Sequence, residues 1–280
     1  MNRNHTHRHH RAIWLEVIAG AFCLIMIFPV YWMFSTSFKL PGNIQTLVPQ
    51  FFPWPITLDN FARAVDKGLF WTYAGNSVIV SIVTVALSIV VAFGAATAVV
   101  RFRFLGRRFF LVTIVVVQMI PGAALVIPIY LMLRSVGALD NLPGLIVTYL
   151  AFVLPFTIWI LQGFVEGVPI ELEEAAMVDG CSRLGAFRWI LLPLLMPGLV
   201  ATSIFAFIQA WNDYVFAYVL MMSQSNYTLP VWLVSFSTAE GVDYGGLIAA
   251  SSLFSLPVLV FFVIIQRRLV TGMSAGAVKG

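Results

Sequence analysis

The sequence contains little charge, and this shortage already sets its class. Only 10% of its 280 residues are charged, whereas 60% are hydrophobic, and the mean hydropathy is +0.94. Soluble globular domains carry about 25% charged residues. The composition therefore excludes an ordinary soluble domain and predicts a polytopic membrane protein.

Histidine and cysteine, which build many catalytic and metal sites, are nearly missing from the body of the chain. All four histidines lie within the first ten residues, so a Ser-His-Asp, Cys-His or His-ligated metal site would depend on the N-terminal tail. Cys23 lies in an apolar run and Cys181 in a polar insert, and we expect both to stay reduced because they lie at different depths. We expect no catalytic residue, no metal site and no cofactor bound by this chain.

Lysine is also scarce, and this bears on nucleotide binding. A P-loop needs a lysine directly after a glycine, at the turn that cradles phosphate. The three lysines follow other residues, in the pairs Phe38-Lys39, Asp66-Lys67 and Val278-Lys279. If the protein's activity uses ATP and Mg²⁺, a separate chain must bind and hydrolyse the nucleotide.

Six apolar runs are long enough for transmembrane helices. They cover residues 12–34, 76–100, 109–133, 143–165, 194–222 and 245–266. The first run has no small-residue cleavage site, so we expect an uncleaved helix. The runs predict an all-α fold with six transmembrane helices in a domain over residues 12–266, between a basic tail at 1–11, which we expect to be disordered, and a tail at 267–280.

Positive charge is distributed unevenly around these runs. With the amino terminus inside, twelve lysines and arginines fall in the cytoplasmic segments and four in the outer segments. The positive-inside rule then places both termini, and the polar insert at 166–193, in the cytoplasm. Residues 35–74 mix prolines, aromatic residues and charges, which is typical of an outside loop with a short amphipathic helix lying at the membrane interface.

The polar insert predicts two short helices. Three glutamates between Glu171 and Glu174 crowd the first turn of one helix, where negative charge suits the positive end of the helix dipole. Gly180 predicts a break after this helix. Ser182 is a candidate cap for the second helix, which is expected to run to Pro193.

The first of these helices is expected to present a narrow face of mainly small side chains. Leu172, Ala175, Ala176 and Asp179 recur at spacings of three and four residues, which brings them to one face. A partner's surface can approach such a face closely.

Two apolar runs contain residues that interrupt helices. These residues are Pro121, Gly122 and Pro128 in the third run and Trp211, Asn212 and Asp213 in the fifth. Bends at membrane depth usually line a cavity. The candidates for a solute pathway or a helix bend are therefore Gln118, Trp211, Asn212 and Asp213.

Asp213 is the clearest chemical anomaly, because an unpaired carboxylate inside a membrane span costs about 2.5–3.5 kcal/mol on insertion scales. Three roles remain open for it. It is a proton site of a secondary transporter, it lies beside a solute path, or it fixes the local bend through hydrogen bonds.

The insert and several other segments resemble a known family. Glu174, Ala175, Ala176 and Gly180, followed by Ile190, Leu192 and Pro193, resemble the EAA loop of inner-membrane subunits of binding-protein-dependent ABC importers. MIPGAALVIPIYLML (119–133), AWNDY (210–214), TLPVWL (228–233) and the ending QRRLVTGMSAGAVKG are similar to the carbohydrate branch, close to the maltose-type second permease subunit. Cys181 stands where that family more often has alanine.

The resemblance implies a function and a set of partners. The chain would be a subunit of an ATP-driven importer that moves a sugar or oligosaccharide across the bacterial inner membrane into the cytoplasm. Its partners would be the lipid bilayer, a second similar permease, two ABC ATPase subunits and an extracytoplasmic solute-binding protein, with no nucleic acid. Glu174, Ala175, Ala176, Asp179, Gly180 and Arg183 would contact the ATPase, and Ser274 and Lys279 in the C-terminal tail would reach between the two ATPases.

Two other functions remain open on the residues alone. The chain could be an ion-coupled secondary transporter, for which Asp213 would be the ionisable group. It could also be a polytopic membrane enzyme or assembly factor.

Overall fold

The structure is a computed structural model that describes residues 4–239 and 241–276. It divides into two compact units, one built from residues up to Gly68 together with Ser235–Leu256, and the other from Leu69–Val234 together with the chain from Pro257 onward. The expected all-α class is confirmed. The one departure among the described residues is a two-residue antiparallel ladder between β1 (Ser237–Thr238) and β2 (Gly241–Val242).

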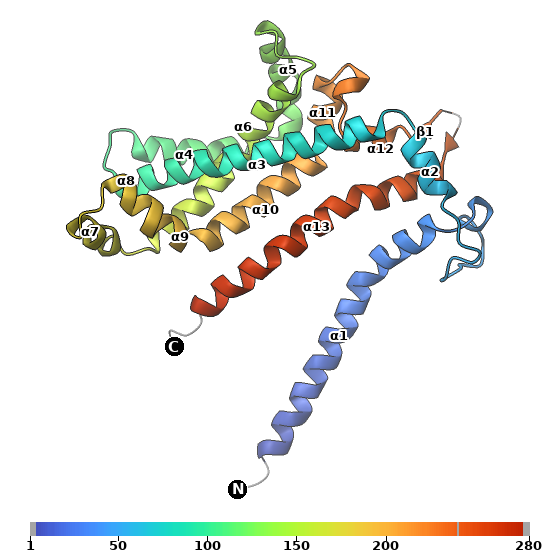
Figure 1. Cartoon of the computed structure of the whole chain (residues 1–280), viewed down its shortest axis with the longest axis horizontal. Coiled ribbons are helices and arrows are strands. Elements are labelled where there is room, and N and C mark those ends of the chain that lie inside the picture. The colour runs from blue at the N-terminus through green and yellow to red at the C-terminus, as the bar shows by residue number, and fades with distance from the viewer. Residues whose placement is uncertain (1–3, 240, 277–280) are drawn as a thin grey trace. The chain divides into compact units, whose positions relative to one another are not determined.

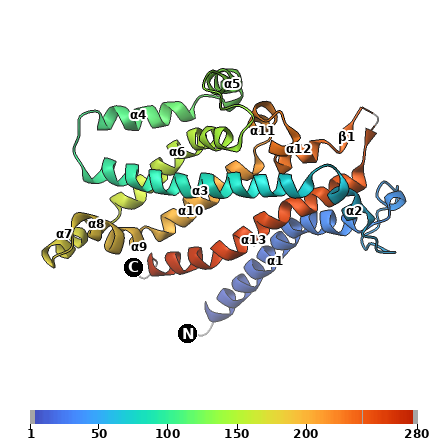
Figure 2. The same ribbon diagram turned by 45° about the horizontal axis from the view of Figure 1, so that its top comes forward.

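The second unit holds most of the helices (Figures 1 and 2). In chain order they are α3 (Phe70–Arg101), α4 (Arg107–Gln118), η2 (Gly122–Leu125), α5 (Val126–Ser135), α6 (Leu142–Glu166), α7 (Glu171–Val178), α8 (Arg183–Ala186), the π-helical turn η3 (Phe187–Leu191), α9 (Leu192–Leu194), α10 (Met196–Asn212), α11 (Val215–Leu220), η4 (Gln224–Asn226) and α12 (Leu229–Val234). Both views show α3, α6 and α10 side by side, with α7 and α8 at one end of this bundle and α5 and α11 at the other.

Helix lengths among the described residues agree with the predicted membrane spans. Four helical stretches are long and apolar enough to cross a membrane: Trp14–Ser37, Phe70–Arg101, Leu142–Glu166 and Tyr244–Ile265. Two bent pairs pass the same test, with a 99° bend between Arg107–Gln118 and Gly122–Ser135 and a 72° bend between Arg183–Leu194 and Met196–Asn212. Counting each bent pair as one span gives the six that the sequence predicts.

The predicted interruptions occur, with two differences. The third run breaks between Gln118 and Gly122, and the fifth breaks at Asp213, as expected. Pro128 does not break α5, because it lies in the first turn. Backbone N–H groups there have no carbonyl partner within the helix, so a proline removes no hydrogen bond. The fifth run also bends at Leu195, which the sequence did not predict.

Small and hydroxylated side chains let helices α3, α6 and α10 of the second unit approach one another closely. Along α3, Ser81, Ser88, Ala92 and Ala96 are fully buried. Small residues at such positions allow close helix contact within a membrane, where the hydrophobic effect does not drive helices together. The unbroken α3, 32 residues long, forms the longest element of this unit.

The first unit contains α1 (Asn4–Ser37), η1 (Pro41–Asn43), α2 (Asp59–Asp66), the β-ladder and the start of α13 (Tyr244–Gly276). The buried Asn60 amide donates to the carbonyl oxygens of Ser37 (2.9 Å) and Lys39 (2.7 Å), which joins α2 to the end of α1. The Arg63 guanidinium lies 3.6 Å from the Asp243 carboxylate, which joins α2 to the segment before α13. The short helix expected between the first two spans is α2.

Both terminal helices are longer than the sequence predicts. Residues 4–11, which we expected to be a disordered tail, continue α1. Thr271–Gly276 continue α13, so the backbone at Ser274 is helical. Lys279 lies outside the described residues.

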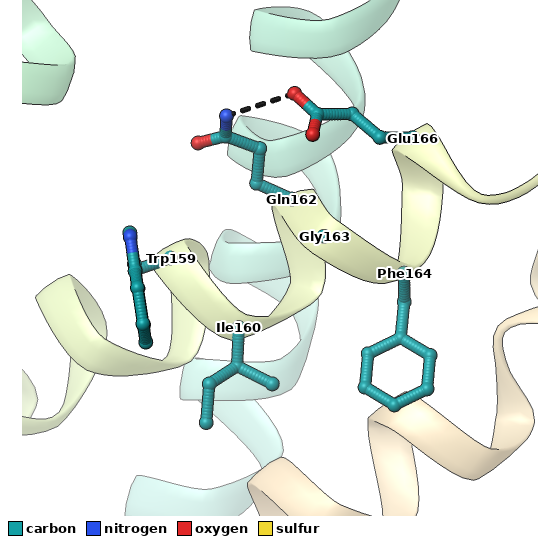
Figure 3. A pocket seen from close by; sticks show the side chains of 6 residues that line it. All are labelled: Trp159, Ile160, Gln162, Gly163, Phe164 and Glu166. Atoms are coloured by element: carbon teal, nitrogen blue, oxygen red, sulfur yellow. Dashed lines mark hydrogen bonds between the residues drawn. The ribbon is translucent and has the colours of Figure 1, made fainter.

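The contact between α6 and α10 depends on a glycine. A β-carbon added at Gly198 would lie 2.6 Å from Cγ of Phe164, whose ring points toward α10 in Figure 3. Gly163, on α6, has no such neighbour within 4 Å. The two positions therefore form a matched pair for testing this packing.

We predict that Gly198→Ala destabilises the protein by about 1–3 kcal/mol, because the ring and the helix must move to make room. Gly163→Ala should be neutral or stabilising by up to about 1 kcal/mol, because alanine favours helix. The melting temperature of the purified protein in detergent measures both effects. Equal melting temperatures of the two variants would contradict the close approach of Phe164 to Gly198.

Candidate functional site

The turn between α7 and α8 has the geometry that the sequence predicts. Gly180 adopts a φ of +94°, a region that favours glycine. The Gly180 amide donates to the carbonyl of Met177 (3.1 Å), and the Cys181 amide donates to the carbonyl of Ala176 (2.9 Å). This pair of bonds is a Schellman motif, which satisfies the last carbonyls of α7 and reverses the chain.

Ser182 caps the second helix, as predicted. Its hydroxyl oxygen accepts from the Gly185 amide at 3.1 Å. The helical path then continues from α8 through the π-helical turn η3 to α9, and it bends at Leu195 into α10. The insert is therefore joined to α10 without a flexible linker.

A buried ion pair fixes α7 to the end of α3. Arg101 Nε lies 2.8 Å from Glu173 Oε1, and the side chains are only 9% and 6% exposed. The same guanidinium donates through Nη2 to the carbonyl of Val168 at 2.8 Å. A charge-assisted contact in this enclosed position holds its geometry strongly, because separating the partners would leave each charge buried without compensation.

The structure brings some of the predicted site residues together. Glu174 and Arg183 line the same cavity of about 110 Å³ between α7, α8 and the end of α3, which Arg101 and Glu173 also line. Arg183 lies over the Phe102 ring, 5.5 Å from its centroid. Asp179, Gly180 and Ala175 do not line this cavity, although all three are exposed on the same short segment.

The predicted small-residue face of α7 is partly wrong. Leu172, Ala175 and Asp179 are exposed, but Ala176 is buried against the chain itself. The buried face contains Ala176 and Glu173, three residues apart, because the ion pair with Arg101 turns that face inward. Sequence reasoning missed Glu173 and Arg101 as a pair, since nothing local distinguishes Glu173 from its neighbouring glutamates.

Asp213 forms the break between α10 and α11 through its own hydrogen bonds. Its Oδ1 accepts from the Tyr149 hydroxyl (3.0 Å) and from the amides of Phe216 (3.0 Å) and Ala217 (3.2 Å). Those amides are orphan donors at the start of α11, so the carboxylate acts as its N-terminal cap. The geometry favours the third of the three roles, in which Asp213 fixes the bend.

Asp213 also lines a cavity of about 270 Å³ in the second unit. The lining residues are Gly122, Tyr149, Phe152, Val153, Gln209, Asp213 and Phe216. The other candidates from the sequence do not line it. Trp211 is buried and stacks on Phe207, while Gln118 and Asn212 are exposed, and Asn212 donates to the Ile208 carbonyl. Tyr149 and Gln209 are polar lining residues that sequence reasoning missed.

A larger open depression of about 500 Å³ lies along α6. Figure 3 shows its side chains on opposite sides of this one helix, with Gln162 donating to Glu166 at 3.0 Å on one side and Phe164 on the other. All its lining residues belong to α6, and residues of a single helix cannot enclose a solute, so this surface is not a candidate site.

The opposite end of α3 is also fixed by hydrogen bonds. The Asn76 amide donates to the carbonyls of Ser225 (2.8 Å) and Tyr227 (2.9 Å), and the Ser77 hydroxyl oxygen accepts from the Leu229 amide (2.8 Å). Helix α3 is thus held at one end by α7 and at the other by the segment that leads into α12 and by the first residue of α12.

Asp140 supports this second contact. Its carboxylate accepts from the amides of Met222 and Ser223, from the Ser223 hydroxyl and from the Asn226 side chain. Desolvation tends to raise the pKa of Asp140, but these hydrogen bonds, led by those from Ser223, together lower it to about 2. The loop before α6 and the segment after α11 are therefore held together at neutral pH.

The comparisons with known proteins agree with this architecture. A solved structure of a bacterial ABC transporter involved in the import of the acidic polysaccharide alginate matches with a TM-score of 0.77 and 26% identity, over 92% of this chain and 96% of that one. The protein is therefore a multi-pass component of a membrane transport system.

The family follows from the sequence comparisons. Residues 85–275 match the family described as "Binding-protein-dependent transport system inner membrane component", and this chain belongs to it. The chain is similar to the diacetylchitobiose uptake system permease protein DasC of Streptomyces coelicolor, with 47% identity over 96% of this chain and 97% of that protein. It is also similar to the trehalose transport system permease protein SugB of Mycobacterium tuberculosis, with 35% identity over 95% and 96%.

These findings confirm the resemblance drawn from the EAA loop and the other quoted segments, including the carbohydrate branch. They also confirm an inner-membrane location with several spans.

The ion pair generates a first prediction for this site. Glu173→Gln should destabilise the protein by about 3–5 kcal/mol, because it leaves the buried Arg101 without a negative partner. Thermal unfolding of the purified protein measures the loss. The matched control is Glu174→Gln in the same helical turn, whose exposed side chain should contribute less than about 1 kcal/mol. A similar small effect at both positions would contradict the buried pair.

Asp213 generates a second prediction, which separates capping of α11 from a proton relay. Asp213→Asn keeps an oxygen that can accept from the amides of α11 and from Tyr149, whereas Asp213→Leu removes it. If the residue caps α11, the asparagine variant should retain most transport and the leucine variant should lose at least tenfold, a loss equivalent to about 1.4 kcal/mol. A proton relay predicts that the asparagine variant is also inactive, and uptake in membrane vesicles distinguishes the two results.

Proposed function

We propose that this chain is a permease subunit of an ATP-driven importer and that α7 is the element through which ATP hydrolysis in a partner chain drives transport. The observation that carries the proposal is the buried Arg101–Glu173 pair, which fixes an exposed polar helix to the end of a long transmembrane helix. A displacement of α7 therefore moves α3 as a rigid body.

The ATPase is supplied by separate subunits in this proposal. The chain has no Gly-Lys pair for a P-loop. Helix α7 and its C-terminal cap instead present exposed residues, among them Glu174, Ala175 and the cap residue Asp179, which would contact an ATPase surface. Arg183 adds a cation to the cavity between α7 and α8 that Glu174 also lines.

A second permease subunit completes the transmembrane part of the proposed complex. In the span Trp14–Ser37, the most apolar stretch of 18 residues is not buried by any other part of the described chain. Such a helix can face either lipid or another subunit, and the family resemblance favours a pair of similar permeases. The positive-inside rule places α7 and both termini in the cytoplasm, and it places the segment around Ser223–Asn226 outside, where it would contact the solute-binding protein.

The substrate is a sugar or oligosaccharide in this proposal. DasC is described as a diacetylchitobiose permease, SugB as a trehalose permease, and a third relative, AraQ of Halalkalibacterium halodurans, as a permease for arabinooligosaccharides. The cavity with Tyr149, Gln209 and Phe152 offers hydrogen-bonding groups next to an aromatic ring, a combination that suits hydroxylated solutes. An ion-coupled secondary transporter is less well supported, because Asp213 is occupied as a helix cap.

The proposal predicts different effects at two positions of the coupling segment. Glu174→Lys should reduce recovery of the ATPase with the permease by at least tenfold, because it reverses the charge that α7 presents to the ATPase, whereas Glu174→Gln should retain most of it. Gly180→Val should insert normally and yet lose coupling, because a β-branched residue is strained at a φ of +94°.

Co-purification and sugar uptake at matched expression measure these effects. Normal uptake in both Glu174→Lys and Gly180→Val, or uptake that persists when ATP is depleted and an ion gradient is held, would overturn the proposal.

A further inference from the structure

The loop between α1 and α2 has an unusual surface for a segment outside the membrane. From Leu47 to Leu58 it contains no charged residue. Its exposed apolar side chains are Leu47, Val48, Phe51, Phe52, Trp54, Ile56 and Leu58. Phe52 is 77% exposed and Trp54 is 79% exposed, so neither side chain serves as core of the first unit.

The loop turns back beside the last turns of α1, as the blue segment between α1 and α2 shows in Figure 1. The Tyr31 hydroxyl donates to the carbonyl of Phe51 at 2.7 Å, and the Ser35 hydroxyl donates to the same oxygen at 2.9 Å. The Phe52 ring packs against Tyr31, and the Phe51 ring packs against Trp32.

These contacts fix the depth of the loop relative to α1. The candidate span Trp14–Ser37 has 24 residues, which corresponds to a length of about 36 Å. This exceeds a hydrocarbon core of about 30 Å. Residues 31–35 therefore lie near the boundary between the acyl chains and the headgroups, and the loop is held at that level.

The backbone of the loop is suited to that boundary. An unpaired carbonyl or amide is costly away from water, but the Phe51 carbonyl accepts two side-chain hydrogen bonds. Pro49, Pro53 and Pro55 have no N–H to desolvate. Trp54 also suits this boundary, because tryptophan is enriched at membrane–water interfaces, and the exposed Phe52 ring adds apolar surface.

We propose that residues 47–56 insert into the headgroup region of the outer leaflet and anchor the end of α1 on the lipid surface. This interaction does not depend on which solute is transported or on how ATP hydrolysis is coupled. The lipid is favoured over a protein partner because the hydrogen bonds to Tyr31 and Ser35 hold an uncharged, exposed apolar loop at the level of the boundary between acyl chains and headgroups.

Nitroxide labels on single cysteines test the proposal in the transporter reconstituted into phospholipid bilayers. Cys23 and Cys181 are first replaced by alanine, and labels are then placed at Phe52, at Trp54 and, as a water-exposed control, at Asp59, the first residue of α2. Uptake activity of each labelled protein shows that it folds and assembles. Relaxation by oxygen, which concentrates in lipid, is compared with relaxation by a water-soluble nickel chelate.

The proposal predicts that oxygen relaxes the labels at Phe52 and Trp54 more strongly than the nickel chelate does, with the opposite ratio at Asp59. A nickel-dominated response at Phe52 and Trp54 would place the loop in water and overturn the proposal. Protection from both reagents, with an immobilised spectrum, would also overturn it, because a protein surface such as a second permease would then cover the loop.

Discussion

The contact on which the rest of the structure depends is the buried ion pair between Arg101 and Glu173. Two charges with almost no access to water can stay together only while their geometry is kept, since separation would leave each one uncompensated. The pair therefore converts a short exposed helix, which has too few residues to be stable alone, into an extension of a transmembrane helix. The Schellman turn at Gly180 and the Ser182 cap then lead the chain back toward α10.

Helix α3 connects this contact to the opposite end of the second unit. It is unbroken over 32 residues, or about 48 Å at 1.5 Å per residue, whereas the spans around α4 and α10 are bent. Its far end is bonded through Asn76 and Ser77 to the segment that Asp140 holds in place. One rigid element thus connects the proposed ATPase side to the surface proposed to meet the solute-binding protein, while the bends at Pro121 and Asp213 lie beside a cavity.

Much of the fold, and the turn between α7 and α8, could be predicted from the sequence, because the residues that determine these features lie close together in the chain. Apolar length predicted the spans, the glycine and serine of the insert predicted its turn and cap, and the proline and aspartate predicted the breaks. The Arg101–Glu173 pair could not be predicted, because its partners are 72 residues apart and three glutamates stand close together in the insert. The burial of Ala176 was missed for the same reason, since the ion pair decides which face of α7 turns inward. The bend at Leu195 and the polar lining of the cavity by Tyr149 and Gln209 likewise depend on how helices pack.

The central claim is that α7 and α3 move as one body when nucleotide binds to the partner ATPase. Pulsed electron resonance between spin labels at Val178 on α7 and Val91 on α3 measures this directly in the reconstituted transporter, with and without ATP. Both side chains are exposed, so labels fit without disturbing the core. The account predicts one narrow distance distribution that is the same in both states and that broadens when Glu173 is changed to glutamine. A distance that shifts on ATP binding in the unchanged protein would contradict it.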